Sequence, residues 1–350
     1  MSIFDNVAFD RHERVAFCND PVTGLKAIVA IHSSARGPAA GGCRFWRYDS
    51  EDAAITDALR LAQGMSYKNA MAGLDLGGGK AVIMAPDSGE LDEPMLEAFG
   101  AFVNTLGGAY ITAEDVGMSV GKMEVVARRT SYVTGLPPKQ GVAGGDPSPK
   151  TADGVFAGIR AAVRYKLGRD SLDGLRVAVQ GVGSVGWHLC QLLFDAGAKL
   201  IVADINAERV ALAREQLGAE VVALDSILES DVDVLSPCAL GAILNAQSIP
   251  RLRAGIIAGA ANNQLATDAD GKRLFEAGVL YCPDFVINAG GIINVACEYA
   301  GDVSDAVVNE KVRAIGDRLI QIFELSDAQK RPTHIIANEQ ARRLIGRDDG

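Results

Sequence analysis

The sequence predicts an α/β protein built from two domains, and three observations lead to this prediction. The chain has 350 residues, a length that on the usual size of domains indicates two. Apolar stretches of strand length alternate with amphipathic stretches of helical length along most of the chain. In the second half, a glycine-rich turn joins a strand directly to a helix, as in parallel sheets that bind ligands at their strand ends.

Composition narrows the range of partners. Hydrophobic residues make up 48% of the chain and charged residues 22%, with a formal net charge of −10, which argues against nucleic acid or an acidic membrane as the main partner. Asp5, Asp10 and Arg11 interrupt the N-terminal segment, so we expect no signal peptide. We also expect a cytoplasmic protein whose six cysteines are thiols, since none forms a C-x-x-C pair, and no metal site.

The first domain begins with strands and helices that the local pattern predicts one by one. Two β-type stretches on either side of a turn-rich hexamer indicate an antiparallel hairpin, and helical spacing follows twice. The predicted strands are Arg14–Cys18 and Leu25–His32, and the predicted helices are Glu51–Ala70 and Leu91–Leu106. Between them, GPAAGGCR at Gly37–Arg44 is predicted to be a flexible turn, either a plain connection or a loop that faces a ligand.

The segment MSYKNAMAGLDLGGGKAV, Met65–Val82, places Lys68 and Lys80 on either side of the glycines Gly77–Gly79. We expect these glycines to form a turn that approaches a ligand closely, with the strand beginning at Lys80. Two ammonium groups held close together disfavour each other's charge, so one of them is suited to proton exchange near neutral pH. The alternative is a surface turn flanked by solvated lysines.

Adjacent carboxylates follow the stretch YITA, which is predicted to be a strand. Glu114 and Asp115 come directly after it and precede a glycine. Strand ends are where α/β folds place their chemistry. One of these carboxylates is therefore either a salt-bridge partner of a lysine or a proton shuttle, and the segment alone leaves both open.

A glycine- and proline-rich segment, Ser131–Pro149, is predicted to connect the domains, and a helix is predicted from Thr151 to Leu167. The apolar stretch Leu175–Gln180 then leads into GVGSVG, a helical segment and a second strand that ends at Asp204. This is the dinucleotide-binding fingerprint G-x-G-x-x-G with an acid about 20 residues on. A pyrophosphate is expected at the helix N-terminus. An aspartate repels a 2′-phosphate and no arginine follows it directly, so we favour NAD over NADP.

Further strands follow, at Val232–Ser236, Gly255–Ala258 and Val279–Cys282. The pair Asn262–Asn263 lies where strand ends face a cofactor, and its amides either bind ligand or form an Asx-type turn. The segment around Asn288, Gly290 and Gly291 is predicted to be another glycine-lined approach to the ligand. Amphipathic helices are predicted at Ser304–Leu325 and Ala337–Ile345, returning to the first domain.

These parts suit the oxidation of an amino acid to its imine, followed by hydrolysis to a 2-oxo acid and ammonia. Hydride transfer is the chemistry of the cofactor, and the protein positions the substrate and moves protons. One lysine can hold a carboxylate, another can exchange protons, and an aspartate can carry a proton to or from nitrogen. A 2-hydroxy acid fits less well, because such enzymes more usually present a histidine and an arginine.

Several motifs together resemble those of the Glu/Leu/Phe/Val dehydrogenase family, and most of all its leucine (branched-chain) members. They are MSYKNAMAGLDLGGGKAVI, YITAEDVG, GDPSPKTADGV, SPCALGAILN, AGAANNQL and PDFVINAGGIINVA, in family order over nearly the whole chain. The resemblance implies an N-terminal α/β substrate-binding and oligomerisation domain at residues 1–145 and a Rossmann-type doubly wound NAD-binding domain at residues 146–330. It implies a cleft between them, and residues 331–350 as a C-terminal helix returning towards the first domain.

The resemblance also implies roles for individual residues. Lys80 would activate water, Asp115 would carry protons to and from the amino group, and Lys68 would bind the substrate carboxylate. The remaining substrate-binding residues would be Ala40, Gly41, Gly42, Met65, Ala113, Asn262, Ile292 and Val295. The cofactor-binding residues would be Thr151, Gly181, Gly183, Ser184, Val185, Gly186, Asp204, Ile205, Cys238, Ala239, Ala260, Asn262 and Asn288.

Two positions bear on the substrate. Leucine-type relatives commonly carry leucine where this chain has Ala40, which leaves room for an aromatic side chain, whereas Ala113 follows the leucine pattern. The sequence therefore predicts NAD-dependent oxidative deamination of leucine, valine or isoleucine, with phenylalanine dehydrogenase as the alternative. A catalytically inactive NAD-binding sensor is a third reading, which the joint presence of Lys68, Lys80 and Asp115 disfavours. A homo-oligomer, either a dimer or an octamer, is expected.

Overall fold

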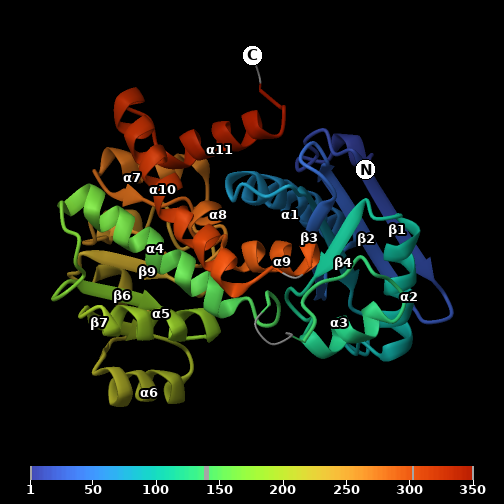
Figure 1. Ribbon diagram of the computed structural model, residues 1–350, viewed down its shortest axis with the longest axis horizontal. Coiled ribbons are helices and arrows are strands. Elements are labelled where there is room, and N and C mark those ends of the chain that lie inside the picture. The colour runs from blue at the N-terminus through green and yellow to red at the C-terminus, as the bar shows by residue number, and fades with distance from the viewer. Residues whose placement is uncertain (1, 138–141, 302, 349–350) are drawn as a thin grey trace. The chain divides into compact units, whose positions relative to one another are not determined.

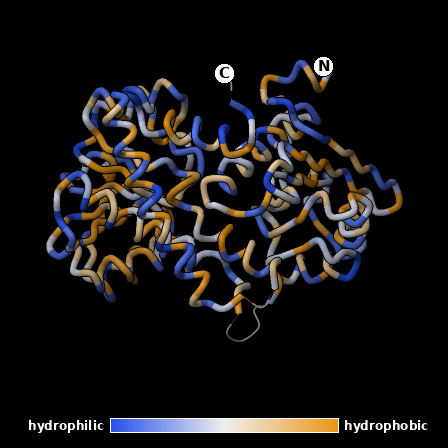
Figure 2. Tube along the Cα trace, turned by 45° about the horizontal axis from the view of Figure 1, so that its top comes forward, coloured by the Kyte–Doolittle hydropathy of each residue, from blue (hydrophilic) through white to orange (hydrophobic). Residues whose placement is uncertain are grey.

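The computed structural model describes residues 2–137, 142–301 and 303–348, which form two compact units (Figure 1). Unit 1 comprises Met1–Asp146, Asn294–Asp305 and Ala341–Gly350, and unit 2 comprises Pro147–Ile293 and Ala306–Gln340. Hydrophobic stretches alternate with hydrophilic ones along the chain in both units (Figure 2). The connection predicted at Ser131–Pro149 includes residues 138–141, which lie outside the described residues.

Unit 1 contains a mixed sheet with the strand order β1-β2-β4-β3-β5. Its strands are β1 (Arg14–Asp20), β2 (Leu25–Ser33), β3 (Ala39–Trp46), β4 (Gly77–Met84) and β5 (Tyr110–Ala113). β1 and β2 form the predicted antiparallel hairpin, β2 also pairs antiparallel with β4, and β3 pairs parallel with both β4 and β5. β3 is therefore an inner strand whose neighbours on both sides contribute to the candidate site.

Helices cover both faces of this sheet. Alternate residues of β2 point to opposite sides, so each set packs against a different group of helices. Ala27, Val29 and Ile31 pack in one hydrophobic cluster with side chains of α2 (Glu93–Thr105) and α3 (Val120–Ala127). Ile28 and Ala30 pack in another cluster with side chains of α1 (Glu51–Met71). The helices predicted at Glu51–Ala70 and Leu91–Leu106 are thus confirmed, and α1 lies against the sheet on its own face.

The two glycine-rich segments of unit 1 are strands, so their prediction as turns was wrong. Gly37–Arg44 contributes most of β3, and Gly77–Gly79 begins β4 instead of preceding it. None of the glycines within these strands has a positive φ. Glycine is required there because neighbouring backbone passes too close for a side chain: a Cβ at Gly41 would overlap the carbonyl oxygen of Gly79, and a Cβ at Gly78 would overlap the backbone of Ser66 in α1.

Unit 2 contains a sheet with the strand order β11-β10-β9-β6-β7-β8, and all of the strand pairs described in it are parallel. The strands are β6 (Arg176–Gln180), β7 (Lys199–Ala203), β8 (Glu220–Val221), β9 (Val234–Pro237), β10 (Ile256–Ile257) and β11 (Leu280–Tyr281). The helices of this unit are α4 (Ser148–Leu167), α5 (Ser184–Asp195), α6 (Ala207–Leu217), α7 (Asp268–Glu276), α8 (Asp284–Ile287) and, apart from its first residue, α10 (Asp305–Gln329). Two more helices, α9 (Gly290–Ala300) and α11 (Thr333–Leu344), begin in unit 2 and end in unit 1. This is the Rossmann-type architecture that the fingerprint predicts.

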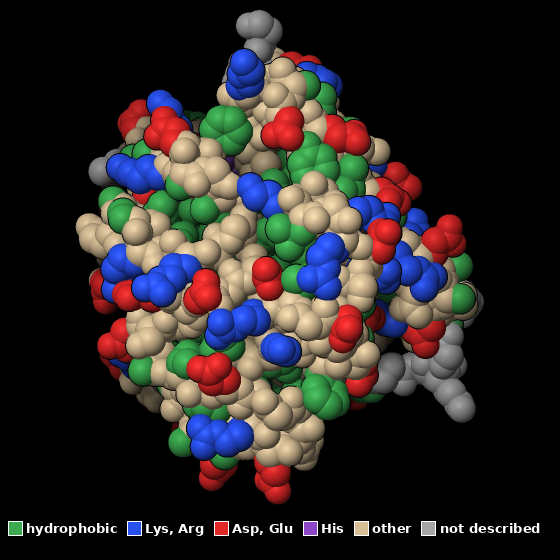
Figure 3. All heavy atoms as spheres, turned by 90° about the vertical axis from the view of Figure 1, so that its left-hand side faces the viewer, with side chains coloured by type: hydrophobic (Ala, Val, Ile, Leu, Met, Phe, Trp, Pro, Cys, Tyr) green, Lys and Arg blue, Asp and Glu red, His purple; other side chains and the backbone are tan. Residues whose placement is uncertain are grey.

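The surface charges, the cysteines and the hydropathy of the helices show no unusual feature in the described residues. On the face shown in Figure 3, acidic and basic side chains are interspersed. The six cysteines all lie in the described part of the chain and are present as thiols. Within that part, no helix is both long enough and apolar enough to cross a membrane.

Candidate active site

An ion pair between a buried lysine and a partly buried aspartate joins the two residues that the sequence analysis assigns as catalytic. Lys80 lies on β4 opposite Ala30 of β2 and is only 5% exposed. Asp115 follows the end of β5, and its Oδ2 accepts a hydrogen bond from the ammonium of Lys80. The other oxygen, Oδ1, accepts a hydrogen bond from the backbone N–H of Val116 at 2.8 Å. The sheet therefore brings together two charges that are 35 residues apart in the sequence.

The environment of Asp115 keeps its carboxylate charged. Burial raises the pKa of Asp115, but the charge and hydrogen bond of Lys80, the charge of Arg44 and the Val116 N–H act in the opposite direction. Their combined effect leaves the pKa below its ordinary value. Near neutral pH, Asp115 is therefore an acceptor poised beside an ammonium group.

Small residues on the neighbouring strands line the space around this pair. Gly42 pairs with Ala113 of β5, and a Cβ at Gly42 would lie 2.8 Å from the Cβ of Asp115. Ala40 and Ala113 are both buried. A Cβ at Gly41 would lie 3.0 Å from Cγ of Met65, which brings α1 to the same place.

Side chains next to Lys68 tie its part of α1 to the sheet. The buried amide of Asn69 donates hydrogen bonds to the carbonyls of Gly77, at 2.6 Å, and Ala40, at 3.3 Å. Ser66 packs directly on Gly78. Lys68 itself is half-buried near the end of the helix. Of the predicted substrate residues, Gly42 lies next to Asp115, and Ala40, Gly41 and Ala113 lie on the strands that flank the pair, with Met65 of α1 next to Gly41. The backbone that carries Lys68 is anchored to the same strands.

Arg44 was not predicted to be a site residue, although it is the last residue of the glycine-rich segment Gly37–Arg44. Arg44 lies on β3, and its Nε is 3.7 Å from Oδ2 of Asp115. Its Nη1 donates a hydrogen bond of 2.9 Å to Oδ2 of Asp57 on α1. An arginine that follows a pair of strand glycines by two positions was the available signal, but only the parallel pairing of β3 with β5 brings it to Asp115.

In unit 2, the G-x-G-x-x-G segment has the geometry of a dinucleotide-binding turn. Gly181 has φ +92°, a conformation that favours glycine, and its missing Cβ leaves room for Ala239. A Cβ at Gly186 would overlap the carbonyl oxygen of Gly181, so this glycine lets α5 pack against the turn. Gly183 is the N-cap of α5 and has no side chain to cap the helix. This helix N-terminus fits an anion such as a pyrophosphate.

Asp204 stabilises that turn, because both of its carboxylate oxygens accept hydrogen bonds from nearby backbone N–H groups. Its Oδ2 accepts a hydrogen bond of 2.6 Å from the backbone N–H of Val182, and its Oδ1 accepts one of 2.8 Å from that of Asn206. The neighbouring Ile205 is 88% exposed. No arginine directly follows Asp204 in the sequence, but the guanidinium of Arg209 on α6 lies 3.4 Å from the position of a Cβ on Gly183. A cation is therefore present beside the turn.

A network of amides lies beyond β10. The side-chain amide of Asn288 donates hydrogen bonds to the carbonyl of Ala260, at 3.0 Å, and to Oδ1 of Asn262, at 2.8 Å. The buried Oδ1 of Asn288 has no hydrogen-bond partner among the described residues. Asn263 has φ +52°, as in the tight turn that was the alternative prediction. An orphaned buried acceptor beside these amides fits a ligand with an N–H group.

Gly290 and Gly291, which were predicted to form a glycine-lined approach to the ligand, lie close to the start of α4. A Cβ at Gly290 would overlap the carbonyl of Lys150, and a Cβ at Gly291 would lie 2.7 Å from Oγ1 of Thr151. These glycines therefore allow the start of α9 to pack against α4. The hydroxyl of Thr151 donates to the carbonyl of Pro147 at 2.9 Å.

Five residues that were predicted to bind substrate or cofactor have no described contact with the Lys80–Asp115 pair or with the amide network around Asn288. Ile292 belongs to unit 2 and Val295 to unit 1, although both lie on α9. Ser184 and Val185 lie in the first turn of α5, and Cys238 directly follows β9, where its N–H donates to the carbonyl of Gln180 at 2.7 Å. Their roles stay predictions.

The fold and these two sets of residues define a dinucleotide-dependent oxidoreductase with a lysine–aspartate pair. Residues 12–132 match the family described as Glu/Leu/Phe/Val dehydrogenase, dimerisation domain, and residues 202–330 match the one described as Glutamate/Leucine/Phenylalanine/Valine dehydrogenase. The leucine dehydrogenase of Geobacillus stearothermophilus is 48% identical over 345 residues, which are 99% of this chain and 94% of that protein. The valine dehydrogenase of Streptomyces virginiae is 46% identical over 89% of this chain and 87% of that protein.

A solved structure agrees with the sequence comparisons. The crystal structure of L-tryptophan dehydrogenase from Nostoc punctiforme matches with a TM-score of 0.84 and 42% identity, covering 96% of each chain. The chain belongs to the Glu/Leu/Phe/Val dehydrogenase family. It is an amino acid dehydrogenase, and its cofactor is a nicotinamide dinucleotide.

Proposed function

We propose that the chain catalyses the reversible, NAD-dependent oxidative deamination of leucine, valine or isoleucine to the 2-oxo acid and ammonia. The observation that carries this proposal is the Lys80–Asp115 pair among the small residues of β3 and β5. A proton donor and a proton acceptor in contact are what imine formation and hydrolysis require. Relatives named leucine and valine dehydrogenase, at 48% and 46% identity, support the substrate class.

The proposed roles follow from the chemistry of each group. Lys68 holds the substrate carboxylate as a cation. Asp115 accepts a proton from the substrate ammonium, so that the neutral amine can lose hydride from Cα to the nicotinamide. Lys80 exchanges a proton with the water that adds to the imine, and its cationic form stabilises the oxyanion that develops. Because Lys80 and Asp115 are hydrogen-bonded, a proton can pass between them without leaving the site.

Replacement of Lys80 tests the catalytic assignment. General acid–base groups contribute about 100- to 10,000-fold to rates, so we expect Lys80→Ala to lower kcat for leucine by that factor while NAD still binds. Lys26→Ala is the matched control, since Lys26 is 56% exposed in unit 1 and pairs with Glu51. A Lys80→Ala enzyme with near wild-type kcat contradicts the assignment. Absence of NADH formation by the wild-type protein with any apolar amino acid favours the inactive sensor.

The substrate side chain is the least determined part of the proposal. Ala40 is 1% exposed and Ala113 is 6% exposed, so both contribute small walls to the interior of unit 1. Each methylene of fit is worth about 1–3 kcal/mol. A panel of kcat/KM values for leucine, valine, isoleucine and phenylalanine decides the matter. A phenylalanine value well above that of leucine supports the aromatic alternative, which the tryptophan-named structural relative also makes reasonable.

The proposal of NAD over NADP depends on Asp204. Its carboxylate would accept hydrogen bonds from the adenosine ribose and repel a 2′-phosphate. Asp204→Ala should therefore raise KM for NAD about tenfold or more and reduce discrimination against NADP. Arg209, beside Gly183, is proposed to neutralise the pyrophosphate, and Arg209→Ala should then weaken both cofactors equally. Selective loss of NADP binding in Arg209→Ala would instead assign this arginine to the 2′-phosphate.

We also propose that the protein is a cytoplasmic homo-oligomer. The family description of residues 12–132 as a dimerisation domain supports assembly through unit 1. The six thiols are compatible with a reducing compartment. Sedimentation equilibrium of the purified protein gives the number of subunits, and a monomer at micromolar concentration would exclude the assembly.

A further inference from the structure

A chain of alternating charges leads from the surface of unit 1 to the catalytic pair. In order, it contains Arg60, Asp57, Arg44, Asp115 and Lys80, each within ion-pair distance of the next. The outermost side chain, that of Arg60, is 54% exposed, the three in the middle are between 15% and 24% exposed, and that of Lys80 at the inner end is 7% exposed. The outer members lie on α1 and the inner members on β3, β4 and the end of β5. Only the last two are used by the proposed reaction.

Arg44 is the link between the two halves of this chain. Its Nη1 donates to Asp57 at 2.9 Å, which satisfies one end of the guanidinium. Its Nε is buried, has no hydrogen-bond partner among the described residues and lies 3.7 Å from Oδ2 of Asp115. That distance is longer than a hydrogen bond but within ion-pair range. The Asp115 carboxylate already accepts a hydrogen bond from Lys80. The buried Nε of Arg44 is therefore a second donor that could bind this carboxylate if Lys80 moved away.

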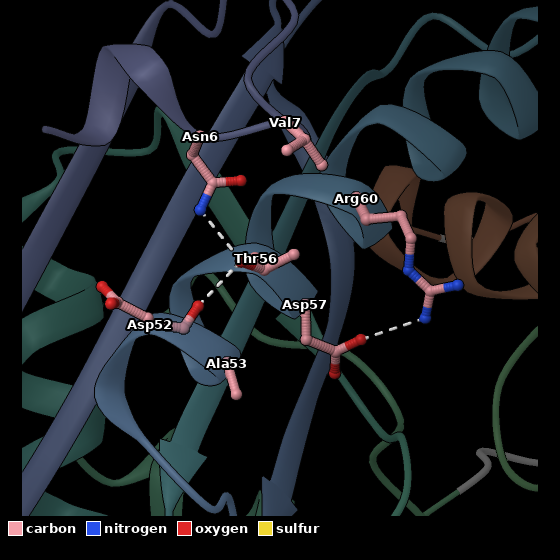
Figure 4. A pocket seen from close by; sticks show the side chains of 7 residues that line it. All are labelled: Asn6, Val7, Asp52, Ala53, Thr56, Asp57 and Arg60. Atoms are coloured by element: carbon pink, nitrogen blue, oxygen red, sulfur yellow. Dashed lines mark hydrogen bonds and ion pairs between the residues drawn. The ribbon is translucent and has the colours of Figure 1, made fainter. Parts of the chain in front are cut away.

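Asp57 holds the other side of Arg44 and is itself shared. Its Oδ2 also accepts a hydrogen bond of 2.8 Å from the hydroxyl of Tyr48, and its Oδ1 accepts one of 3.1 Å from Arg60. Asp57 and Arg60 form part of the wall of an open cavity of about 470 Å³, where their ion pair is visible in Figure 4. The strength of the Arg44–Asp57 contact therefore determines how far Arg44 is held from Asp115.

We propose that Arg44 is a positioning residue for Asp115, which takes over its carboxylate when Lys80 turns to the substrate, and that Asp57 restrains Arg44 until then. The proposal rests on the proposed function, because it assigns Arg44 to the step in which Lys80 and Asp115 act separately. Without Arg44, the departure of Lys80 would leave a largely desolvated carboxylate without an opposite charge, which is unfavourable. With it, Asp115 keeps an opposite charge throughout.

The titratable groups that face Asp115 determine the sign of the expected effect. They include Lys80 on β4, Cys43 and Arg44 on β3, Tyr110 on β5 and Tyr48 after β3. Burial raises the pKa of the Cys43 thiol and of both tyrosines, so these three are neutral near pH 7. The charge of Arg44 acts to lower the pKa of Asp115.

Two substitutions should therefore move the same titration in opposite directions. R44Q removes a cation near Asp115 and should raise the acid-side midpoint of kcat/KM for leucine by about one pH unit. D57N removes an anion and releases Arg44 towards Asp115, so it should lower that midpoint. A defect of packing alone would make both variants worse in the same way. R44K keeps the charge but loses the fork that reaches both carboxylates, and should give a midpoint between wild type and R44Q.

R47Q is the matched control, because Arg47 follows β3, is 61% exposed and contacts Asp87 instead. It should leave the profile of kcat/KM unchanged. The role in turnover predicts that R44Q lowers kcat by tenfold or more, whereas KM for leucine changes less. Midpoints that shift in the same direction in R44Q and D57N, or that do not shift, overturn the proposal, and D57N and R44K supply this test if R44Q does not fold.

A direct titration separates this inference from the proposed function. Carbon-13 NMR of the full-length enzyme labelled with [4-13C]aspartate follows the Asp115 carboxyl, which the spectrum of D115N identifies. Opposite NMR shifts in R44Q and D57N without any amino acid oxidation would leave the coupling of Arg44 to Asp115 standing and exclude the proposed function. If the enzyme oxidises leucine but the NMR titration of Asp115 is unchanged in R44Q, the proposed function stands and the coupling of Arg44 to Asp115 is excluded.

Discussion

The close approach of β3 to Asp115 makes Gly42→Ala an informative substitution. The added Cβ would lie 2.4 Å from the carbonyl oxygen of Glu114, 2.8 Å from the Cβ of Asp115 and 3.1 Å from the carbonyl carbon of Glu114. Ordinary contact begins at 3.4 Å, so β3 and Asp115 have to move apart by about 0.6 Å. The contacts on Glu114 are backbone atoms, which cannot turn aside as a flexible side chain can. The displacement is therefore imposed in part on the carboxylate of Asp115, the proposed proton carrier.

Both the rate and the stability should respond. Since a displacement of 1 Å can cost about a hundredfold in rate, a shift of this size should lower kcat for leucine by tenfold or more. Overpacking of a filled interior costs about 1–3 kcal/mol, which for a unit of this size lowers Tm by roughly 2–12 °C. Initial rates of NADH formation and thermal unfolding followed by circular dichroism measure the two effects.

Gly64→Ala is the control for the chemical change itself. Gly64 lies in the exposed interior of α1, and a Cβ there has nothing within 4 Å. Alanine should stabilise the helix by about 0.5–1 kcal/mol without altering kcat. If Gly42→Ala behaved like Gly64→Ala, the assignment of Asp115 as the group crowded by β3 would be refuted.

Three further predictions concern separate parts of the molecule. Ser50→Ala removes the hydroxyl that accepts a 3.1 Å hydrogen bond from the backbone N–H of Ala53 at the start of α1. It should lower the free energy of unfolding in urea by about 1 kcal/mol. An unchanged midpoint would mean that solvent caps the helix equally well. Gly186→Ala should abolish NAD binding in a fluorescence titration, because its Cβ would overlap the carbonyl of the phosphate turn, and retained affinity would contradict that packing. Burial, together with the charge of Arg347, lowers the pKa of His32 from 6.5 to about 3, so this histidine stays neutral in the folded state and stability should fall as pH drops below 6.5. The free energy of unfolding of the wild type should therefore decline between pH 8 and pH 5 by about 2 kcal/mol more than that of His32→Asn, and equal declines would show that His32 is not kept neutral.

Features that depend on neighbours along the chain were predictable from the sequence. The hairpin of β1 and β2, the helix α1 and the fingerprint around Gly181 follow from apolar period, turn residues and a short spacing between strand and helix. The motif order was sufficient to indicate the family, which the comparisons then confirmed. The position of Lys80 after a glycine run and of Asp115 near a strand end marked them as candidates, and the family resemblance assigned their roles.

Other features required the tertiary structure, because they depend on which strands are neighbours. In sequence, Gly41, Gly42 and Gly77–Gly79 were indistinguishable from turn glycines, since the signal for a turn and for a close backbone approach is the same residue. Their role became clear only with the parallel pairing of β3 with β4 and β5.

The sequence by itself determined the β1–β2 hairpin, the helices α1 and α2 and the dinucleotide turn, because these are properties of short segments. Its motifs also indicated the two main catalytic candidates through the family resemblance. Only the tertiary structure decided which charge meets which. The partner of Lys80 is 35 residues away, and Arg44 reaches both Asp57 and Asp115 from an inner strand. Electrostatic interactions depend on distance in space and on burial, and strand pairing sets both.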